Sequence, residues 1–401
     1  MKYSNFTSRI SGEGAEAWKI HDEATERLNN GEDIILLSIG DPDFDTSNII
    51  VDAAIQSLKA GDTHYAEFMG DKELRSTLAS LYSKHAAQPV GPDNVIILAG
   101  AQCALYCAAH CLLDPGDEII VPEPTYVTYE AVIGATGANI VNVPMDPDQN
   151  FRLDIDKLEE AISPRSKAIL LTSPHNPTGR CISKEEWQQI GELCEAHDLW
   201  LISDEVYASL VYEGEHNCAL NIPTLANRCI IVNSLSKSHA MSGWRLGWLV
   251  GPELFIQHVC NMVTCMLYGC PTFIQKAAIL ALNSSEHICK PMADVYRSRR
   301  DLAHKKLNSV PDLHCGLPRG GMFLMVDIRK SGLSAQEFSS QLLRNYGVSA
   351  LAGEAFGKSA AGHLRISLCV SKAELLDACN RIVRCFTELK QLKNNSVFPT
   401  N

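Results

Sequence analysis

The 401-residue sequence contains no apolar run approaching the roughly eighteen residues that a membrane-spanning helix needs. Its opening residues, MKYSNFTSRISGEG, also lack the apolar stretch of a secretory signal peptide. Basic residues are in the minority: 35 Lys and Arg against 47 Asp and Glu give a net charge of −12. Such a surface repels phosphate backbones and anionic lipid, so we expect no nucleic acid or membrane partner and a cytoplasmic location.

Cysteine, by contrast, is abundant, with fifteen residues in the chain. An odd number without a secretion signal favours reduced thiols over disulfides. Cys103, Cys107 and Cys111 recur every four residues and therefore share one face of a helix. A metal site there is one interpretation, but a free cysteine usually packs as a small hydrophobe, so we expect a buried face and no metal.

Short apolar segments alternate with helical patterns between about residues 50 and 290. This alternation indicates βα units and a mostly parallel sheet that helices cover on both faces. In sheets of this kind ligands bind at the carboxyl ends of the strands, which is where the polar motifs occur. The predicted strands are 94–100, 118–124, 138–145, 167–174, 199–205, 228–234 and 247–251.

The last third of the chain has a different pattern. Helical patterns near 291–309 and 335–346 flank predicted strands at 323–328 and 363–370. This mixture is typical of an α+β unit, and the length of the chain favours more than one domain. We therefore predict a large α/β domain over 46–290 and a smaller α+β domain from 1–45 and 291–401, with an N-terminal arm.

The segment NSLSKSHAMSGWRLGW (233–248) carries the strongest chemical signal. A single lysine such as Lys237 is usually a solvated surface charge. Here Ser234, Ser236 and Arg245 stand close to it in sequence, and hydroxyls with an arginine can bind a phosphate. A lysine beside a phosphate site, with its pKa lowered by burial, is suited to forming a Schiff base.

Other polar residues follow the predicted strands. Asp204 and Tyr207 stand three apart in SDEVY and would share a face of a helical turn. Asn176 lies in the rigid turn SPHNPTGR. A strand-end cap would explain Asp204 alone, and turn chemistry would explain Asn176 alone. A ligand site would explain these residues together.

Two further segments have the same ambiguity. The strand-to-helix junction AGAQCALY offers the free N–H groups of Gly100, Ala101 and Gln102 to an anion. Tyr126, in PEPTYVTY, could stack on a flat ring.

Taken in this order, the segments resemble the class I and II aminotransferases of pyridoxal-phosphate fold type I over nearly the whole chain. NPTG, D-x-V-Y and S-x-S-K followed by G-x-R-x-G are specific in combination, although each is common alone. The resemblance implies an α/β large domain with a mostly parallel seven-stranded sheet, a small α+β domain and pyridoxal 5′-phosphate as cofactor. It also implies ping-pong transamination between an L-amino acid and a 2-oxo acid, and a homodimer with shared active sites.

The resemblance also implies a role for each matching residue. Lys237 would carry the cofactor, Asp204 would pair with its pyridine nitrogen, and Tyr207 and Asn176 would bond its phenolic oxygen. The other cofactor contacts would be Tyr126 on the ring face, Ser234, Ser236, Arg245, Gly100, Ala101 and Gln102 on the phosphate, and Tyr65 on the phosphate of the neighbouring subunit. The substrate α-carboxylate would be held by Arg365 with Asn176 and the backbone of Gly40.

Five segments are similar to the bacterial arginine–pyruvate branch of this family: KYSNFTSRISGEGAEAW, LSIGDPDFDT, LAGAQCALY, NSLSKSHAMSGWRLGW and LAGEAFG. That likeness implies arginine catabolism: L-arginine and pyruvate give 2-oxo-5-guanidinopentanoate and L-alanine. Glu67, two residues after Tyr65, is our candidate partner for the guanidinium, although a plain surface glutamate is an equal explanation. Aspartate, aromatic or broad amino-acid specificity stays open, as does a cysteine-conjugate β-lyase.

Overall fold

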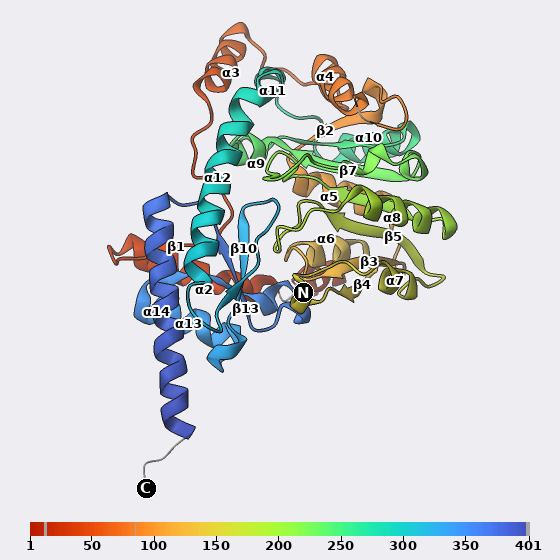
Figure 1. Cartoon of the computed structure of the whole chain (residues 1–401). Coiled ribbons are helices and arrows are strands. Elements are labelled where there is room, and N and C mark those ends of the chain that lie inside the picture. Colours follow the sequence, from red (N-terminus) through yellow and green to blue (C-terminus); the bar gives the residue numbers. More distant parts are fainter. Residues whose placement is uncertain (12–13, 85, 398–401) are drawn as a thin grey trace.

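The computed structural model describes residues 1–11, 14–84 and 86–397 (Figure 1). In this part of the chain the strands form one seven-stranded sheet, one four-stranded sheet and one two-stranded pair. No helix within the described ranges is both long enough and apolar enough to cross a bilayer.

The large sheet confirms all seven strands predicted between residues 94 and 251. Its spatial order is β2-β8-β7-β6-β5-β3-β4, and β8 alone runs antiparallel to its two neighbours. Except for the edge strand β4, whose residues are largely exposed, these strands are buried apolar runs because both faces of the sheet are covered. Their bounds are β2 Val95–Leu98, β3 Glu118–Glu123, β4 Asn139–Pro144, β5 Ser166–Thr172, β6 Trp200–Asp204, β7 Cys229–Ser234 and β8 Gly247–Val250.

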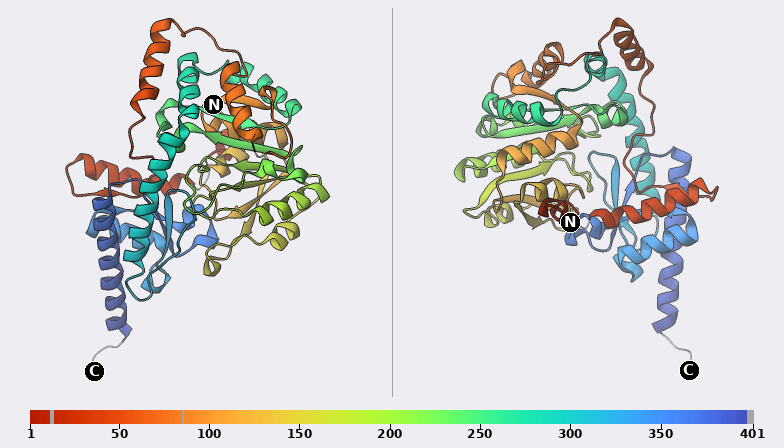
Figure 2. Two further views of the ribbon diagram at one scale, coloured as in Figure 1. Left: turned by 45° about the horizontal axis from the view of Figure 1, so that its top comes forward. Right: turned by 180° about the vertical axis from the view of Figure 1, so that it is seen from behind.

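Helices cover both faces of this sheet (Figure 2). Alternate residues of β2 show the two faces: Ile96 packs in one buried cluster and Ile97 in another. One face packs against α5 (Ala101–Leu112), α6 (Tyr129–Thr136) and α10 (Glu253–Met266). The other packs against α3 (Asn48–Ala60), α4 (Lys72–Ser83), α7 (Ile155–Glu160), α8 (Lys184–Ala196) and α11 (Thr272–Asn283).

The C-terminal part forms a separate buried cluster around the four-stranded antiparallel sheet. The order of this sheet is β12 (Leu351–Ala352), β13 (His363–Ser367), β10 (Phe323–Asp327) and β9 (His314–Cys315). It packs with α13 (Ala335–Tyr346), α14 (Lys372–Val397) and α12 (Ser285–Leu307), which begins well before the predicted start near 291 and has Pro291 inside it.

In the N-terminal segment, α1 (Asn5–Arg9) packs against α6, where the Arg9 Nε donates to the Gly134 carbonyl at 2.9 Å. The elements that follow α1 lie beside the C-terminal ones (Figure 1). After α2 (Gly14–Asn29), β1 (Ile35–Leu36) pairs in parallel with β11 (Val348–Ser349). This pairing brings Ser38 and Gly40, just after β1, toward the carboxyl ends of the large sheet, where they meet Arg365 and Lys237. The domain boundaries at residues 46 and 290 stay a prediction.

Candidate active site

Polar side chains from the ends of β5, β6 and β7 surround one cavity of about 160 Å³. Parallel strands bring their carboxyl ends to one edge of the sheet, which explains the convergence. Ten predicted cofactor residues line this cavity: Ala101, Gln102, Tyr126, Asn176, Asp204, Tyr207, Ser234, Ser236, Lys237 and Arg245. A larger cavity of about 770 Å³ is lined in part by Glu205, Asn233 and Trp248, but none of the predicted cofactor residues lines it.

Lys237 stands on the short helix α9 (Leu235–Ser238), which begins directly after β7. Ser234 caps this helix, because its hydroxyl accepts a hydrogen bond from the backbone N–H of Ser236 at 3.4 Å. The Lys237 Nζ donates to the Gly40 carbonyl at 2.5 Å. Burial lowers the pKa of Lys237, and the nearby Asp41 carboxylate opposes that shift. The amine is therefore easier to deprotonate than a surface lysine, as a nucleophile requires.

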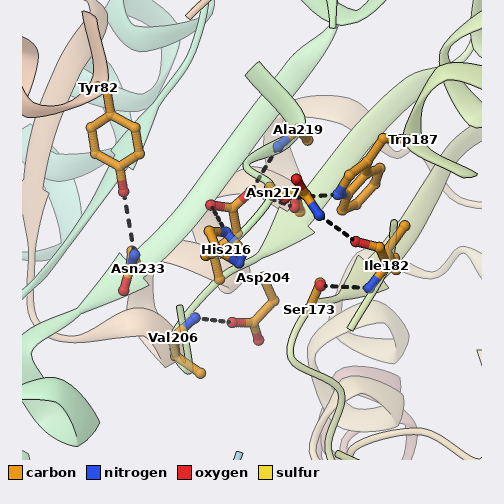
Figure 3. Close-up of polar contacts among 12 residues, drawn as sticks. Tyr82, Ser173, Ile182, Trp187, Asp204, Val206, His216, Asn217, Ala219 and Asn233 are labelled. Carbon is orange, nitrogen blue, oxygen red and sulfur yellow. Dashed lines mark hydrogen bonds and ion pairs between the residues drawn. The ribbon is translucent and has the colours of Figure 1, made fainter. Parts of the chain in front are cut away.

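Asp204 ends β6 and is 4% exposed. Its Oδ1 accepts the Val206 backbone N–H at 3.2 Å (Figure 3), and its Oδ2 accepts the Tyr129 hydroxyl at 2.6 Å. Burial raises the pKa of Asp204 to about 6, against the lowering effect of these hydrogen bonds. A buried carboxylate without a cation is costly, so a positively charged group on a bound ligand would stabilise it.

Arg365 on β13 lies beside the cavity and joins two of the predicted residues. Its Nη1 donates to the Asn176 Oδ1 at 3.3 Å, and the Asn176 Nδ2 donates to the Tyr207 hydroxyl at 3.5 Å. Its Nη2 donates to the Ser38 carbonyl at 2.7 Å.

The same guanidinium is buried between two aromatic rings. Its carbon lies 4.1 Å from the ring centre of Phe323 and 4.7 Å from that of Phe356. Burial lowers the pKa of Arg365 to about 10, and its Nε has no partner among the described residues. A buried cation with a free donor is prepared for an anion such as a substrate carboxylate.

The start of α5 forms an anion cradle. Gly100 caps the helix at a φ of 85°, and a Cβ at this position would stand 2.5 Å from the Arg245 Nη2, so only glycine fits. Arg245 is itself held by the Ser242 carbonyl at 2.7 Å. Free N–H groups at a helix N-terminus beside an arginine favour a phosphate.

Taken together, these groups fit pyridoxal 5′-phosphate. They provide an amine for its aldehyde, a buried acid for its pyridine nitrogen and a cradle for its phosphate. Tyr126 supplies an aromatic ring at the cavity wall, edge-on to Tyr129 with the ring centres 5.6 Å apart.

Two predicted residues do not join the cavity of their own chain. Tyr65 is 84% exposed and packs on Tyr268 with ring centres 5.0 Å apart. Glu67 forms an ion pair with Arg75 at 3.4 Å and is otherwise largely exposed. The roles given to both residues stay predictions.

Sequence reasoning missed the residues that support the acid. Tyr129, three residues after Tyr126 in PTYVTY, bonds Asp204, and the Thr172 hydroxyl lies 2.7 Å from the Tyr129 hydroxyl. The spacing of the two tyrosines was a signal that Tyr129 starts a helix facing the same edge.

The residue after the acid, Glu205, faces the larger cavity instead. It is fully paired, because it accepts hydrogen bonds from the His216 ring at 2.8 Å and the Ala219 N–H at 3.1 Å. Figure 3 draws these contacts of His216 and Ala219. As for metals, the described residues contain no cluster of three or more His, Cys, Asp or Glu that could hold an ion.

Comparison with known proteins points in one direction. Residues 32–382 match the family described as aminotransferase class I and II. The sequence is 52% identical to arginine–pyruvate transaminase AruH of Pseudomonas aeruginosa, over 97% of this chain and 99% of that one. It is 36% identical to an aspartate aminotransferase of Pyrococcus horikoshii, over 90% of this chain and 92% of that one. The structure of Thermus thermophilus aspartate aminotransferase with maleate superposes with a TM-score of 0.91 at 31% identity, covering 96% of this chain and 100% of that one.

Proposed function

Because the chain belongs to the class I and II aminotransferases, which use pyridoxal phosphate, we propose that it transfers the α-amino group of L-arginine to pyruvate. The products are 2-oxo-5-guanidinopentanoate and L-alanine. The observation that carries this substrate assignment is the likeness to the arginine–pyruvate enzyme along nearly the full length of both chains.

The charges around the cavity support a cationic amino donor. Among the residues that line it, the cations are Lys237 and Arg245, and the cofactor would engage both. Arg365 is the group for the α-carboxylate. Asp41, next to Gly40, places a negative charge within electrostatic reach of Lys237, which favours a guanidinium over a second carboxylate.

When bound, pyridoxal phosphate supplies an aldehyde for the amino group and a ring that draws electrons from the substrate Cα. The buried carboxylate of Asp204 would hold a positive charge on the bound cofactor. Arg365 and Asn176 fix the carboxylate and so orient the Cα–H bond, which can be worth several kcal/mol. Lys237 Nζ, with its lowered pKa, takes the proton from Cα.

The proposal extends to assembly and location. The exposed aromatic cluster of Tyr65, Phe68 and Tyr268 supports a homodimer, in which Tyr65 of the partner subunit would reach the phosphate. We propose a large domain over 46–290 and a small domain from 1–45 and 291–401. A cytoplasmic location agrees with the fifteen free cysteines. The role that we propose for the enzyme there is arginine catabolism.

A single-turnover screen tests the substrate assignment. Each amino acid is added to the cofactor-loaded protein without a 2-oxo acid, and conversion to pyridoxamine phosphate is followed by absorbance. We expect L-arginine to convert fastest and pyruvate to reverse the conversion with release of L-alanine. Fastest conversion with aspartate or an aromatic amino acid would overturn the assignment, and pyruvate with ammonia from a β-substituted amino acid would identify a lyase.

A further inference from the structure

The cavity of about 770 Å³ is lined by direct neighbours in the chain of two cofactor residues. Glu205 follows Asp204 at the end of β6, and Asn233 precedes Ser234 at the end of β7. Further walls come from α4 and α12. Small-molecule sites in proteins are usually of this size, so the cavity has room for a second ligand next to the cofactor site.

Tyr82, on α4, lines this cavity, and its hydroxyl oxygen accepts two hydrogen bonds. The donors are the Trp248 Nε1 at 3.1 Å and the Asn233 Nδ2 at 3.3 Å (Figure 3). The Asn233 amide cannot be reversed, because its Oδ1 accepts the Ser234 N–H at 2.8 Å. Burial, with the Glu205 carboxylate, raises the pKa of Tyr82, so the phenol keeps its proton. That proton is free to donate, and no residue in the described part of the chain accepts it.

His216 provides an acceptor on the lining of the same cavity. Its Nε2 lies 2.8 Å from the Glu205 Oε2 and donates to that carboxylate. The neutral ring therefore carries its proton on Nε2, which leaves Nδ1 as an acceptor, and Nδ1 has no partner within the described ranges. The cavity thus offers a ligand one O–H donor and one nitrogen acceptor.

The charge of the lining is mainly negative. With the histidines neutral, its charged side chains are four carboxylates and two cations: Glu205, Glu215, Glu286, Asp294, Lys290 and Arg297. Lys290 and Asp294 pair with each other at 3.2 Å, so the excess lies with the three glutamates. The hydrogen bonds of the buried Glu205 position its carboxylate without removing its charge. This lining favours a cation over an anion.

We propose that the cavity binds a small organic cation that also carries an oxygen acceptor, at a site separate from that of the amino-acid substrate. The ligand oxygen accepts the Tyr82 proton, and an N–H of the cation donates to the His216 Nδ1. The aliphatic part of the ligand packs on the apolar side chains of the lining, which include Leu78, Leu235 and Leu282. An ammonium or guanidinium group on a short aliphatic chain with an amide or carboxylate has this chemistry.

A chain of hydrogen bonds joins this cavity to the cofactor site. Asn233 links Tyr82 to the backbone of Ser234, whose hydroxyl accepts the Ser236 N–H at 3.4 Å and caps the helix that carries Lys237. An acceptor for the Tyr82 proton makes its oxygen a better acceptor for Asn233, which strengthens the chain. The ligand and pyridoxal phosphate should therefore increase each other's affinity by the same factor. This coupling rests on the proposed cofactor site but not on the proposed amino donor.

The probe is 4-guanidinobutanamide, which has a guanidinium and an amide oxygen. It lacks both an amine for the cofactor aldehyde and a carboxylate for Arg365. Isothermal titration calorimetry measures its binding to the full, cofactor-loaded chain, with 4-ureidobutanamide as the neutral ligand of the same shape. We expect saturable binding of the guanidinium compound, weaker binding of the urea, and no competition with arginine in turnover. Titration with pyridoxal phosphate should show tighter binding when the probe is present.

Matched variants test each contact. Tyr82→Phe should weaken the probe about three- to tenfold and remove its effect on cofactor affinity. Because this change also leaves two donors unpaired, Glu286→Gln on the exposed surface of α12 gives a second test: it should weaken the guanidinium compound and not the urea. Tyr346→Phe is the control, since its hydroxyl donates to Glu388 at 2.6 Å outside the cavity.

Three results would overturn the site: no binding of the probe, equal binding to the natural protein and to both cavity variants, or competition with arginine. Binding that leaves cofactor affinity unchanged would overturn the coupling. Because calorimetry needs no turnover, failure of the arginine assignment would leave these measurements intact.

Discussion

The Tyr129 hydroxyl lies 2.6 Å from the Asp204 Oδ2 and donates its proton to that carboxylate. The Thr172 hydroxyl lies 2.7 Å from the Tyr129 hydroxyl oxygen. Because the Tyr129 proton is already donated to Asp204, Thr172 acts as the donor to Tyr129. The three groups form a buried chain that ends on the acid facing the cavity. Such a chain fixes the carboxylate and favours its ionised form.

Tyr129→Phe removes the hydroxyl and keeps the ring. Loss of a hydrogen bond to a charged group costs about 1.5–3 kcal/mol, so we expect the cofactor-loaded variant to react about 10 to 100 times more slowly with amino acid. The pKa of Asp204 should rise further, shifting the acid limb of the rate profile to higher pH. Stopped-flow measurement against pH checks both expectations. Thr172→Val, which leaves the Tyr129–Asp204 bond in place, should have the smaller effect, and an unchanged profile in Tyr129→Phe would contradict the argument.

The buried acid should also affect stability in a pH-dependent way. The folded pKa of Asp204 is about 6, and an unfolded aspartate titrates near 3.9. Because the folded value is higher, the protonated acid favours the folded state. This contribution to the free energy of unfolding is complete below about pH 4 and is lost as the pH rises through 6. The loss amounts to about 3 kcal/mol. Urea unfolding of the cofactor-free protein at pH 4.5 and 7.5 measures this, with Asp204→Asn as reference. The variant should gain stability relative to the natural protein at the higher pH, and a constant difference would be evidence against the shift.

The buried strands of the large sheet could be predicted because they are continuous apolar runs, and the cofactor residues because they follow those strands. The two-residue strands β1 and β9 were not predicted, since two residues carry no periodicity. Likewise, the helix α12 could not be given its correct start, because Pro291 lies inside it rather than at its first turn.

The supporting contacts of the site could not be read from the sequence at all. Tyr129 and Asp204 are far apart in the chain, and only the packing of α6 against the sheet brings them together. The two rings around Arg365 come from separate segments of the C-terminal part. For Glu67, the ion pair with Arg75 depends on side-chain rotamers, for which the sequence gives no rule.

Lys237→Ala should abolish turnover while the protein still folds. The side chain is partly buried and donates a hydrogen bond to the Gly40 carbonyl, so its removal costs little native packing. Loss of the general base alone should cost about 10²–10⁴ in rate. Absorbance of the lysine-bound cofactor should disappear, and circular dichroism should stay native. Turnover near the natural rate, or borohydride fixing the cofactor to another lysine, would remove Lys237 from its role.

Arg365→Lys keeps a positive charge but loses the planar fork and the stacking between Phe323 and Phe356. A lost bidentate contact of about 2–3 kcal/mol should raise KM by about 30- to 150-fold. The increase should be the same for arginine and alanine, because both present the same α-carboxylate. Steady-state kinetics with the two amino acids test this, and a selective effect on arginine would assign Arg365 to the side-chain pocket instead.

Glu67→Gln tests the remaining part of the arginine hypothesis. Its carboxylate is largely exposed and pairs at 3.4 Å with the buried Arg75, which keeps two other partners, the Gly70 carbonyl at 3.1 Å and the Pro92 carbonyl at 3.0 Å. The pair can therefore open at little cost when a substrate guanidinium arrives, and KM for arginine should rise more than KM for alanine in the variant.

Glu73→Gln supplies the matched control: it removes an exposed carboxylate on α4 that pairs with Lys276 at 3.4 Å, and it should leave KM for both amino acids unchanged. If Glu67→Gln changes KM for the two amino acids equally, Glu67 is a surface residue and Asp41, on the Lys237 side of the cavity, becomes the carboxylate to replace next.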